Sequence, residues 1–230
     1  MRVTTLELPA RWSRCDEALH QVDHLLSHGP TDLVLLPEAS LSGYVSPEGD
    51  FDLTPFAEDL QGPTARALSS LAVKHRTHLI GPLVERAGAQ CFNSMLGFGP
   101  TGLQVLHYRK RHPWFPEAWA TAGTEPLPVL EVAGHRFCLA VCFDLHFLRA
   151  ESEAQLKAVD TLLFSSAWVD DQSPVRPAML GALARDYSIN VVNANWGPGA
   201  PRVFGQGGSM IIDPKGAPVG SGTVRLDATL

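Results

Sequence analysis

Short apolar runs rich in β-branched residues alternate with amphipathic segments along the whole chain, and this alternation limits the fold more than any other feature. The runs have the length and composition of buried strands, and the segments between them repeat apolar residues at helical spacing. Interleaved strands and helices favour an α/β layered fold. Strands are expected over 31–38, 78–85, 92–99, 103–110, 128–134, 136–143, 161–168, 190–196 and 209–214, and helices over 13–29, 62–76, 148–159 and 173–188.

The chain has no internal repeat, low-complexity tract or linker-like stretch, so its 230 residues are expected to form one domain over 1–230. For the first helix, Ser13 is the expected N-cap and Gly29 the expected end.

The charge balance and the cysteines exclude several classes of protein. The formal net charge is −6, which argues against nucleic acid as the main partner, because phosphate binding requires a basic surface. No window approaches the ~20 apolar residues of a membrane span, and the first residues lack the apolar core of a signal peptide. Four cysteines form no C-x-x-C pair, which suits a reducing compartment. We therefore expect a cytoplasmic protein without nucleic-acid or membrane partners.

Two patterns resemble cofactor or metal motifs without their context. The stretch "GFGPTG" at 97–102 matches G-x-G-x-x-G, but a strand follows it instead of the helix that would meet a pyrophosphate. His20 and His24 lie four apart on a predicted helix, yet no glutamate follows His20 as in zinc proteases and no third ligand is evident. Neither a cofactor nor a metal is expected.

Polar side chains follow three predicted strands at the point where each strand ends. Glu38 follows "LVLLP", Lys110 follows "LHYR", and Cys142 closes the run "FCLAV". In α/β sheets, strand ends are where ligands bind and where polar side chains share a crevice. These three residues are therefore the first candidates for a catalytic site.

A cysteine, a carboxylate and an amine together suit acyl transfer. Only the thiolate attacks, so a nucleophilic Cys142 needs a base, and a carboxylate becomes a better base when burial raises its pKa. Glu38 is the candidate base, and would later protonate the departing amine and activate water. Lys110 and the backbone N–H of Phe143 would stabilise the oxyanion. The predicted reaction is hydrolysis of an amide or a nitrile.

A different assignment uses only the residues next to the cysteine, with His146 as the base and Asp144 as its orienting carboxylate. In an extended chain, Cys142 and His146 would be ~13 Å apart, which is too far for proton transfer. A sharp turn after Cys142 would bring them together, so this alternative stays open.

The same residues lie in segments that resemble the three signature segments of the nitrilase superfamily of carbon-nitrogen hydrolases. The segments read "LVLLPEASLSGY", "FNSMLGFGPTGLQVLHYRKRHPWFPE" and "GHRFCLAVCFDLHF", and the similarity extends over nearly the whole chain. The resemblance places the family's Glu-Lys-Cys triad on Glu38, Lys110 and Cys142. It implies a four-layer αββα sandwich that forms a homodimer, no metal, and hydrolysis through a thioester.

The resemblance also bears on the substrate. Glu117 is the best match for a second family glutamate that holds the lysine and the substrate, although it comes one residue earlier than in the aliphatic amidase branch. The sequence C-F-D after the strand is closer to the C-Y-D of amidase-like branches than to the C-W-E of nitrilases. We therefore expect an amidase that acts on linear amides, with a small, uncharged or weakly charged aliphatic amide or carbamoyl compound as substrate. Hydrolysis of an N-carbamoyl compound or a nitrile, or a non-catalytic binding or regulatory role, is the alternative.

Four further residues are assigned to the substrate pocket. Tyr44, Trp168 and Asn195 follow strands where the family's pocket lies. His146 stands where many amidase-like members have an arginine. In branches where that arginine meets a substrate carboxylate, its loss weakens the case for dicarboxylate monoamides, and His146 becomes a candidate specificity residue.

Overall fold

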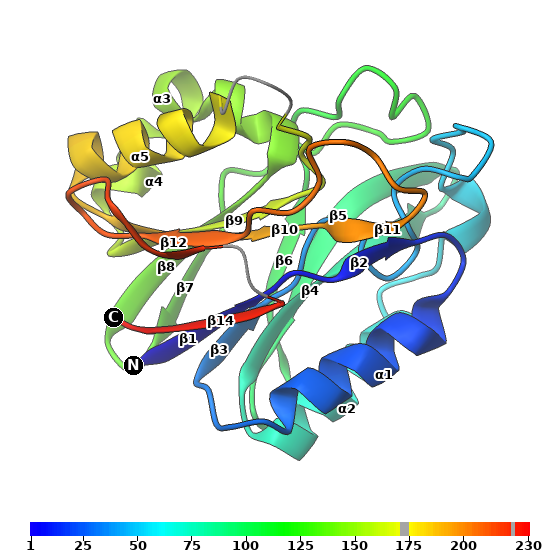
Figure 1. Ribbon diagram of the computed structural model, residues 1–230. Helices are drawn as coiled ribbons and strands as arrows, with labels where there is room; N and C mark the ends of the chain where they lie inside the picture. The colour runs from blue at the N-terminus through cyan, green and yellow to red at the C-terminus, as the bar shows by residue number, and fades with distance from the viewer. Residues whose placement is uncertain (171–174, 222–223) are drawn as a thin grey trace.

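Two six-stranded sheets lie face to face in the computed structural model, which describes residues 1–170, 175–221 and 224–230 (Figure 1). The first sheet has the order β14 (Arg225–Thr229), β1 (Arg2–Leu6), β3 (Leu33–Leu35), β4 (His78–Ala87), β5 (Gln90–Phe98) and β6 (Gln104–Arg109). The second has the order β13 (Pro218–Ser221), β12 (Met210–Ile212), β10 (Asn190–Asn195), β9 (Thr161–Ser166), β8 (His135–Val141) and β7 (Val129–Val132). A small third sheet pairs β2 (Pro9–Arg11) with β11 (Gly197–Ala200).

Helices cover the outer face of each sheet and complete four layers. Helices α1 (Cys15–Leu26) and α2 (Pro63–His75) lie on the first sheet, and α3 (Leu148–Glu151), α4 (Glu153–Lys157) and α5 (Val175–Tyr187) lie on the second (Figure 1). Apolar side chains of both sheets meet between them, among them Leu35, Ile80, Phe137 and Leu163, all without exposed surface. This arrangement confirms the predicted αββα sandwich.

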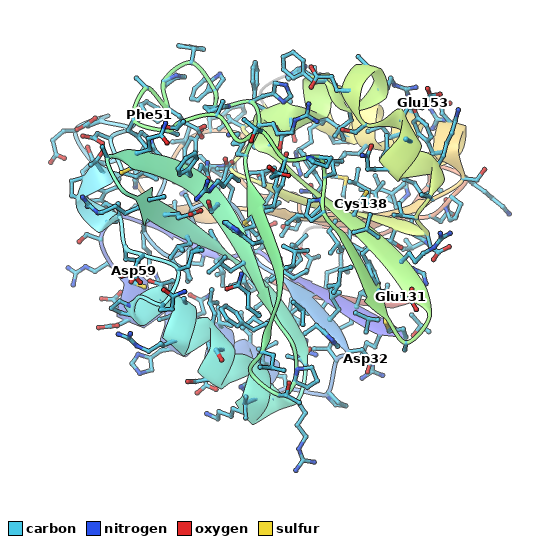
Figure 2. The ribbon with its side chains drawn as sticks, turned by 180° about the vertical axis from the view of Figure 1, so that it is seen from behind. Asp32, Phe51, Asp59, Glu131, Cys138 and Glu153 are labelled. Carbon is cyan, nitrogen blue, oxygen red and sulfur yellow. The ribbon has the colours of Figure 1, made fainter. Side chains whose placement is uncertain are left out.

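Strand direction brings several strand ends to one edge of the sandwich. In the first sheet β3 and β4 are parallel. Strand β5 is antiparallel to both β4 and β6, so β6 runs in the same direction as β4. In the second sheet β8, β9 and β10 are parallel. The two sheets are joined near this edge, where the Ser165 hydroxyl donates to the Leu36 carbonyl oxygen at 2.9 Å. Figure 2 shows Phe51 in the loops at this end and Asp32 and Glu131 at the opposite end.

All nine predicted strands are present, with ends that differ by a few residues. The segment predicted as one helix over 148–159 is two short helices that meet at Ser152, a residue type that favours helix caps over helix interiors. Ser13 as the N-cap of α1 is wrong: its N–H binds the Ser42 carbonyl at 2.9 Å with φ at 57°, and Arg14 is the N-cap. Of the helix predicted over 173–188, Ser173 and Pro174 lie outside the described residues.

The strands that the sequence did not predict include both chain ends. Strand β1 carries Thr4 and Thr5, which interrupt its apolar pattern but are fully buried. Their hydroxyls have partners, since Thr4 binds Asp227 on β14 and Thr5 binds the Asn193 carbonyl oxygen across the sheets. Strands β2, β11, β13 and β14 are short or Gly-rich edge pieces with little apolar pattern. Among the described residues, no helix is both long and apolar enough to cross a membrane.

Candidate active site

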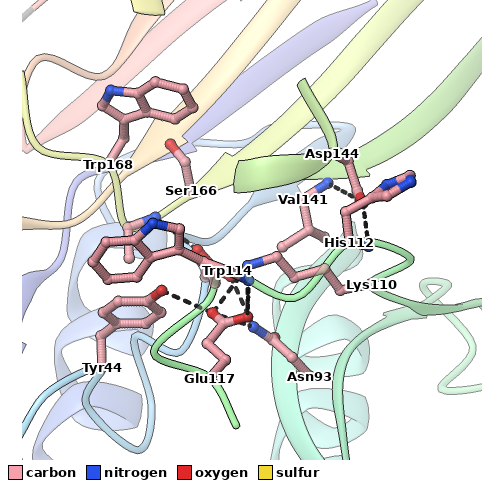
Figure 3. Close-up of polar contacts among 12 residues, drawn as sticks. Tyr44, Asn93, Lys110, His112, Trp114, Glu117, Val141, Asp144, Ser166 and Trp168 are labelled. Carbon is pink, nitrogen blue, oxygen red and sulfur yellow. Dashed lines mark hydrogen bonds and ion pairs between the residues drawn. The ribbon is translucent and has the colours of Figure 1, made fainter. Parts of the chain in front are cut away.

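Lys110 joins two glutamates at the edge where the strand ends meet. Its Nζ lies 2.7 Å from Glu38 Oε1 and 2.9 Å from both carboxylate oxygens of Glu117. The three side chains have almost no exposed surface, from 0% to 1%. The sequence separates Glu38 from Glu117 by 79 positions, and the fold brings both carboxylates to Lys110. Figure 3 shows the contacts of Lys110 with Glu117.

Each member of this cluster is held by backbone around it. Pro37 ends the strand before Glu38, and Lys110 is anchored by its N–H to the Asn93 carbonyl oxygen at 2.8 Å. Glu117 lies in the loop after β6, where its Oε2 accepts the N–H of Trp114 at 3.0 Å. The carboxylates are therefore fixed before any substrate binds.

Asn93 belongs to this cluster although the sequence analysis did not identify it. It lies on β5, is 4% exposed, and its Nδ2 donates to Glu38 Oε1 at 2.8 Å and to Glu117 Oε1 at 3.3 Å. The only feature of the sequence that could have identified Asn93 is its position as a single asparagine inside the apolar run "FNSMLGF". A buried amide inside a strand requires partners, so it was a candidate for a polar cluster.

Cys142 begins a sharp turn directly after β8. The turn is a single 3-10 segment over Cys142–His146, and Cys142 itself has φ at 45°. A non-glycine residue in the left-handed region is uncommon and persists only where the surroundings enforce it. Here Asp144 does so, because its Oδ2 accepts the N–H of Val141 at 3.1 Å.

The electrostatics of the cluster keep the thiol protonated before substrate binds. Burial raises the pKa of Cys142 well above its ordinary value, and Glu38 adds to the rise, while Lys110 and the N–H of Ala167 oppose it. Two carboxylates face one ammonium, so a thiolate would add another negative charge to a buried site. The thiol must therefore lose its proton during attack, to a base within reach.

Protonation of the other groups follows the same charge balance. Burial and Glu38 raise the pKa of Glu117, although Lys110 opposes this. For Lys110, burial disfavours the charge, but Glu38, Cys142 and Glu117 raise the pKa above its ordinary value. Lys110 is therefore a permanent cation. Its three N–H donors face three carboxylate oxygens, so an oxyanion beside it would be stabilised by the charge of the ammonium or by sharing one of these N–H groups.

The backbone N–H of Ala167 connects the base to the nucleophile. It donates to Glu38 Oε2 at 3.0 Å and also acts on the thiol of Cys142. Oε2 and Sγ therefore lie on the same side of the cluster. Oε1 is turned away toward Lys110 and Asn93.

The alternative relay from Asp144 through His146 to Cys142 is not assembled. The carboxylate of Asp144 accepts from Tyr108 Oη at 2.8 Å and from the backbone N–H and ring Nδ1 of His112 at 2.9 and 3.0 Å. Within the described part of the chain, no hydrogen bond joins Asp144 to His146. The turn does bring His146 near the nucleophile, but its ring packs on Trp168, with centroids 5.4 Å apart.

A cavity of about 430 Å³ opens beside Cys142, and we call it the aromatic cavity. Its aromatic or heteroaromatic walls are Tyr44, Phe51, Trp114, Phe143, His146, Trp168 and Trp196, and the rest are Val45, Gly49, Cys142, Ala167, Val169 and Val203. The structure therefore places three predicted pocket residues, Tyr44, His146 and Trp168, at this cavity. Phe143 is the second residue of the turn that Cys142 begins, where N–H groups have no partner within the turn.

Asn195, the fourth predicted pocket residue, is not among the described residues that line the aromatic cavity. Its Oδ1 accepts from Ser166 Oγ at 2.9 Å and from the Trp168 N–H at 2.8 Å. Its Nδ2 donates to the carbonyl oxygens of Trp168 and Gly207, at 2.9 and 2.8 Å. All its hydrogen bonds are made within the protein, so Asn195 positions Trp168 rather than contacting substrate.

A buried thiol next to a carboxylate–amine–carboxylate cluster, at the shared edge of two face-to-face sheets, defines a site suited to acyl transfer from a carbon–nitrogen bond. The chain belongs to the carbon-nitrogen hydrolase family, whose sequence model matches residues 1–224. This assignment confirms the family that the three segments resembled.

Individual relatives are distant but cover most of the chain. An (R)-stereoselective amidase of Pseudomonas sp. is 27% identical over 189 residues, which cover 82% of this chain and 68% of that enzyme. A probable nitrilase of Schizosaccharomyces pombe is 27% identical over 202 residues, covering 86% and 72%. A solved variant of the amidase from Nesterenkonia sp. AN1 has a TM-score of 0.85 at 24% identity, covering 100% of this chain and 90% of that one. In that structure the acetamide moiety of fluoroacetamide is attached to the active-site cysteine.

Proposed function

We propose that this protein hydrolyses a small amide through a thioester on Cys142, releasing ammonia and a carboxylic acid. The observation that carries the proposal is the ammonium of Lys110 fixed between Glu38 and Glu117 beside a buried thiol. A cation locked in this position suits a reaction that develops negative charge on a carbonyl oxygen.

In the first half-reaction, the Sγ–H proton passes to Glu38 Oε2 as Sγ forms a bond to the amide carbon. The negative charge on the carbonyl oxygen is stabilised by the ammonium of Lys110 and the backbone N–H of Phe143. Glu38 then donates the proton to the amide nitrogen as the C–N bond breaks. Ammonia leaves and the acyl group stays on Cys142.

In the second half-reaction, water replaces ammonia. Glu38 takes a proton from the water as its oxygen bonds to the thioester carbon. The C–S bond then breaks, and Sγ recovers the proton from Glu38. The products are the carboxylic acid and the original thiol, so no cofactor or metal is required by the scheme.

An amide is favoured over a nitrile as the substrate. Amidases and a probable nitrilase are both among the relatives, so the family alone does not decide between them. The sequence C-F-D after β8 is nearer to the amidase-like pattern. The adduct of the structurally similar amidase keeps its amide group, so it supports only a reactive cysteine in a site that a small amide compound can enter.

The test compares Cys142→Ala with Cys138→Ala. Both cysteines are buried, but Cys138 lies inside β8 in the hydrophobic core, four residues before Cys142 (Figure 2). Ammonia release from a panel of amides should vanish in Cys142→Ala and persist in Cys138→Ala. The Cys138 substitution should lower only the free energy of unfolding. Wild-type mass spectrometry after rapid quenching should show the acyl adduct on the peptide with Cys142.

Four results would contradict the proposal. Amide hydrolysis by Cys142→Ala would remove the cysteine from the reaction. Release of ammonia from nitriles but not from amides would favour nitrile hydrolysis, and release of CO₂ with ammonia would identify an N-carbamoyl substrate. A wild-type protein that releases ammonia from none of these compounds would indicate a non-catalytic protein.

A further inference from the structure

The wall of the aromatic cavity has an unusual composition for a site that hydrolyses a polar bond. Seven of its residues are aromatic or heteroaromatic, and the described residues that line it include no Asp, Glu, Lys or Arg. The charged cluster lies behind this wall, where Tyr44 and Trp114 donate to Glu117 and Ala167 donates to Glu38. A substrate therefore meets charge at its amide end and rings along the rest of its length.

Hydrogen-bonding groups on this wall are partly used by the protein itself. The hydroxyl of Tyr44 donates to Glu117 Oε1 at 2.8 Å, and Nε1 of Trp196 donates to the Trp168 carbonyl oxygen at 3.0 Å. Burial and the two glutamates raise the pKa of Tyr44, so its hydroxyl remains a donor. A carboxylate on the substrate would have no cation to pair with and would approach a cluster that holds two glutamates.

The volume of the cavity indicates how large the acyl group is. A dry apolar cavity of roughly 150 Å³ is enough to hold benzene. The aromatic cavity, at about 430 Å³, has nearly three times that volume and lies within the usual range of small-molecule sites. Acetamide would leave most of this apolar wall without contact, whereas a ring on a short spacer would fill it.

We infer that the aromatic cavity selects primary amides whose acyl group is uncharged, apolar and as large as a six-membered ring. The inference rests on the proposed amide hydrolysis and specifies its substrate class. Apolar contact with the ring walls favours such acyl groups, because each buried apolar surface lowers the free energy of the complex. An unpaired carboxylate or ammonium is disfavoured, since the described residues of the wall offer no opposite charge.

His146 is the specificity residue that this selection depends on most directly. Its ring lies between those of Phe143 and Trp168, with centroid distances of 4.8 and 5.4 Å. It shares the turn Cys142–His146 with the thiol and lines the cavity, so a basic side chain at this position would add a fixed charge to the wall. Replacing it tests the effect of wall charge without touching the cluster.

The experiment measures kcat/KM for two matched pairs of amides. The first pair is 3-phenylpropanamide and propanamide, which differ by the ring, and we expect the ring to raise kcat/KM by about 10-fold or more. The second pair is pentanamide and 4-carbamoylbutanoate, which differ by one carboxylate, and we expect the charge to lower it by about 100-fold or more. 5-Aminopentanamide, which carries an ammonium, should be equally poor.

Binding to Cys142→Ala separates this inference from the proposed chemistry. Three tryptophans line the cavity, so quenching of their fluorescence reports binding without turnover. The same order of amides is expected for affinity in this variant. If the wild type hydrolyses no amide but the variant binds in this order, the proposed function fails and the inference about the cavity stands. Equal binding and equal hydrolysis across the panel would refute the inference and leave the function intact.

Two substitutions at His146 complete the test. His146→Arg should raise kcat/KM for 4-carbamoylbutanoate relative to pentanamide by about 10-fold, because it gives the carboxylate a partner. His146→Phe keeps a flat ring without charge and should leave the ratio within about 2-fold of the wild type. A thermal melt confirms that both variants fold. An unchanged ratio in a folded His146→Arg variant would refute the role of His146.

Discussion

Asp144 holds the turn that begins at Cys142 against the loop after β6, and its replacement by asparagine tests how much these contacts contribute to stability and activity. Its Oδ1 accepts from the N–H and ring Nδ1 of His112, and its Oδ2 accepts from Tyr108 Oη and the Val141 N–H. The side chain is almost fully buried, at 1% exposed. Asp144→Asn preserves shape but turns one acceptor oxygen into an NH₂ donor, which then faces two other donors.

The expected loss of stability depends on which hydrogen-bond donors around Asp144 can find another partner. If the amide nitrogen faces Tyr108 and Val141, the phenol can rotate to accept, but the Val141 N–H loses its partner. A buried donor without a partner costs about 1–3 kcal/mol, and bonds to a charged acceptor are worth more than bonds to a neutral one. We therefore expect Asp144→Asn to lower the free energy of unfolding by about 2–4 kcal/mol.

The assay is urea denaturation with activity measured in parallel. Because Val141 directly precedes Cys142, kcat should also fall, by about 10-fold or more, if loosening the turn moves the nucleophile by ~1 Å. The control is Tyr108→Phe, which removes only one of the four donors and should cost about 1 kcal/mol. A folded Asp144→Asn variant within about 0.5 kcal/mol of the wild type, with unchanged kcat, would refute the argument.

Three other predictions concern charge. Lys110→Met leaves Glu38 and Glu117 buried without a cation, so it should abolish ammonia release and lower the free energy of unfolding by about 3–5 kcal/mol in urea; an active variant would contradict the site. Burial opposes ionisation of Glu85, but its partners, His107 first among them, lower its pKa to about 2. The stability this gives is present above about pH 4.3 and is lost as the pH falls toward 2, so Glu85→Gln should flatten acid unfolding curves in that window. A hydrogen bond to Asp144 raises the pKa of His112, so the contribution of His112 to the free energy of unfolding should be complete below about pH 6.5 and decline as the pH rises above it. If the free energy of unfolding of His112→Asn depends on pH as the wild type does, this prediction is wrong.

The sequence singled out the proposed reacting groups because each one follows a buried strand. Glu38, Lys110 and Cys142 all follow apolar runs, and the parallel strands of an α/β fold collect such positions at one edge. Glu117 was harder to place, since it lies in a loop whose path the sequence does not determine. Its match rested on resemblance, and the contacts with Lys110 now place it in the cluster.

The residues that support the cluster could not be assigned from spacing. Asn93 lies inside a strand, and which of its two faces meets the glutamates depends on how β5 packs on its neighbours. The sequence analysis considered Asp144 as a carboxylate that orients His146, and it assigned Asn195 to the substrate pocket. In the structure both bind backbone N–H groups, of Val141 and Trp168, and so position the residues around them.

The two glutamates that share Lys110 differ in what remains free on each carboxylate. Oε1 of Glu117 accepts from Tyr44, Asn93 and Lys110, and its Oε2 accepts from Lys110 and the Trp114 N–H. Glu38 uses Oε1 for Lys110 and Asn93, and its Oε2 meets only the Ala167 N–H among the described contacts. A carboxylate oxygen has two acceptor positions, so Oε2 of Glu38 keeps one for a proton on the side of Cys142. We therefore propose Glu38 as the base and Glu117 as the group that fixes the ammonium, although both lie within 3 Å of it.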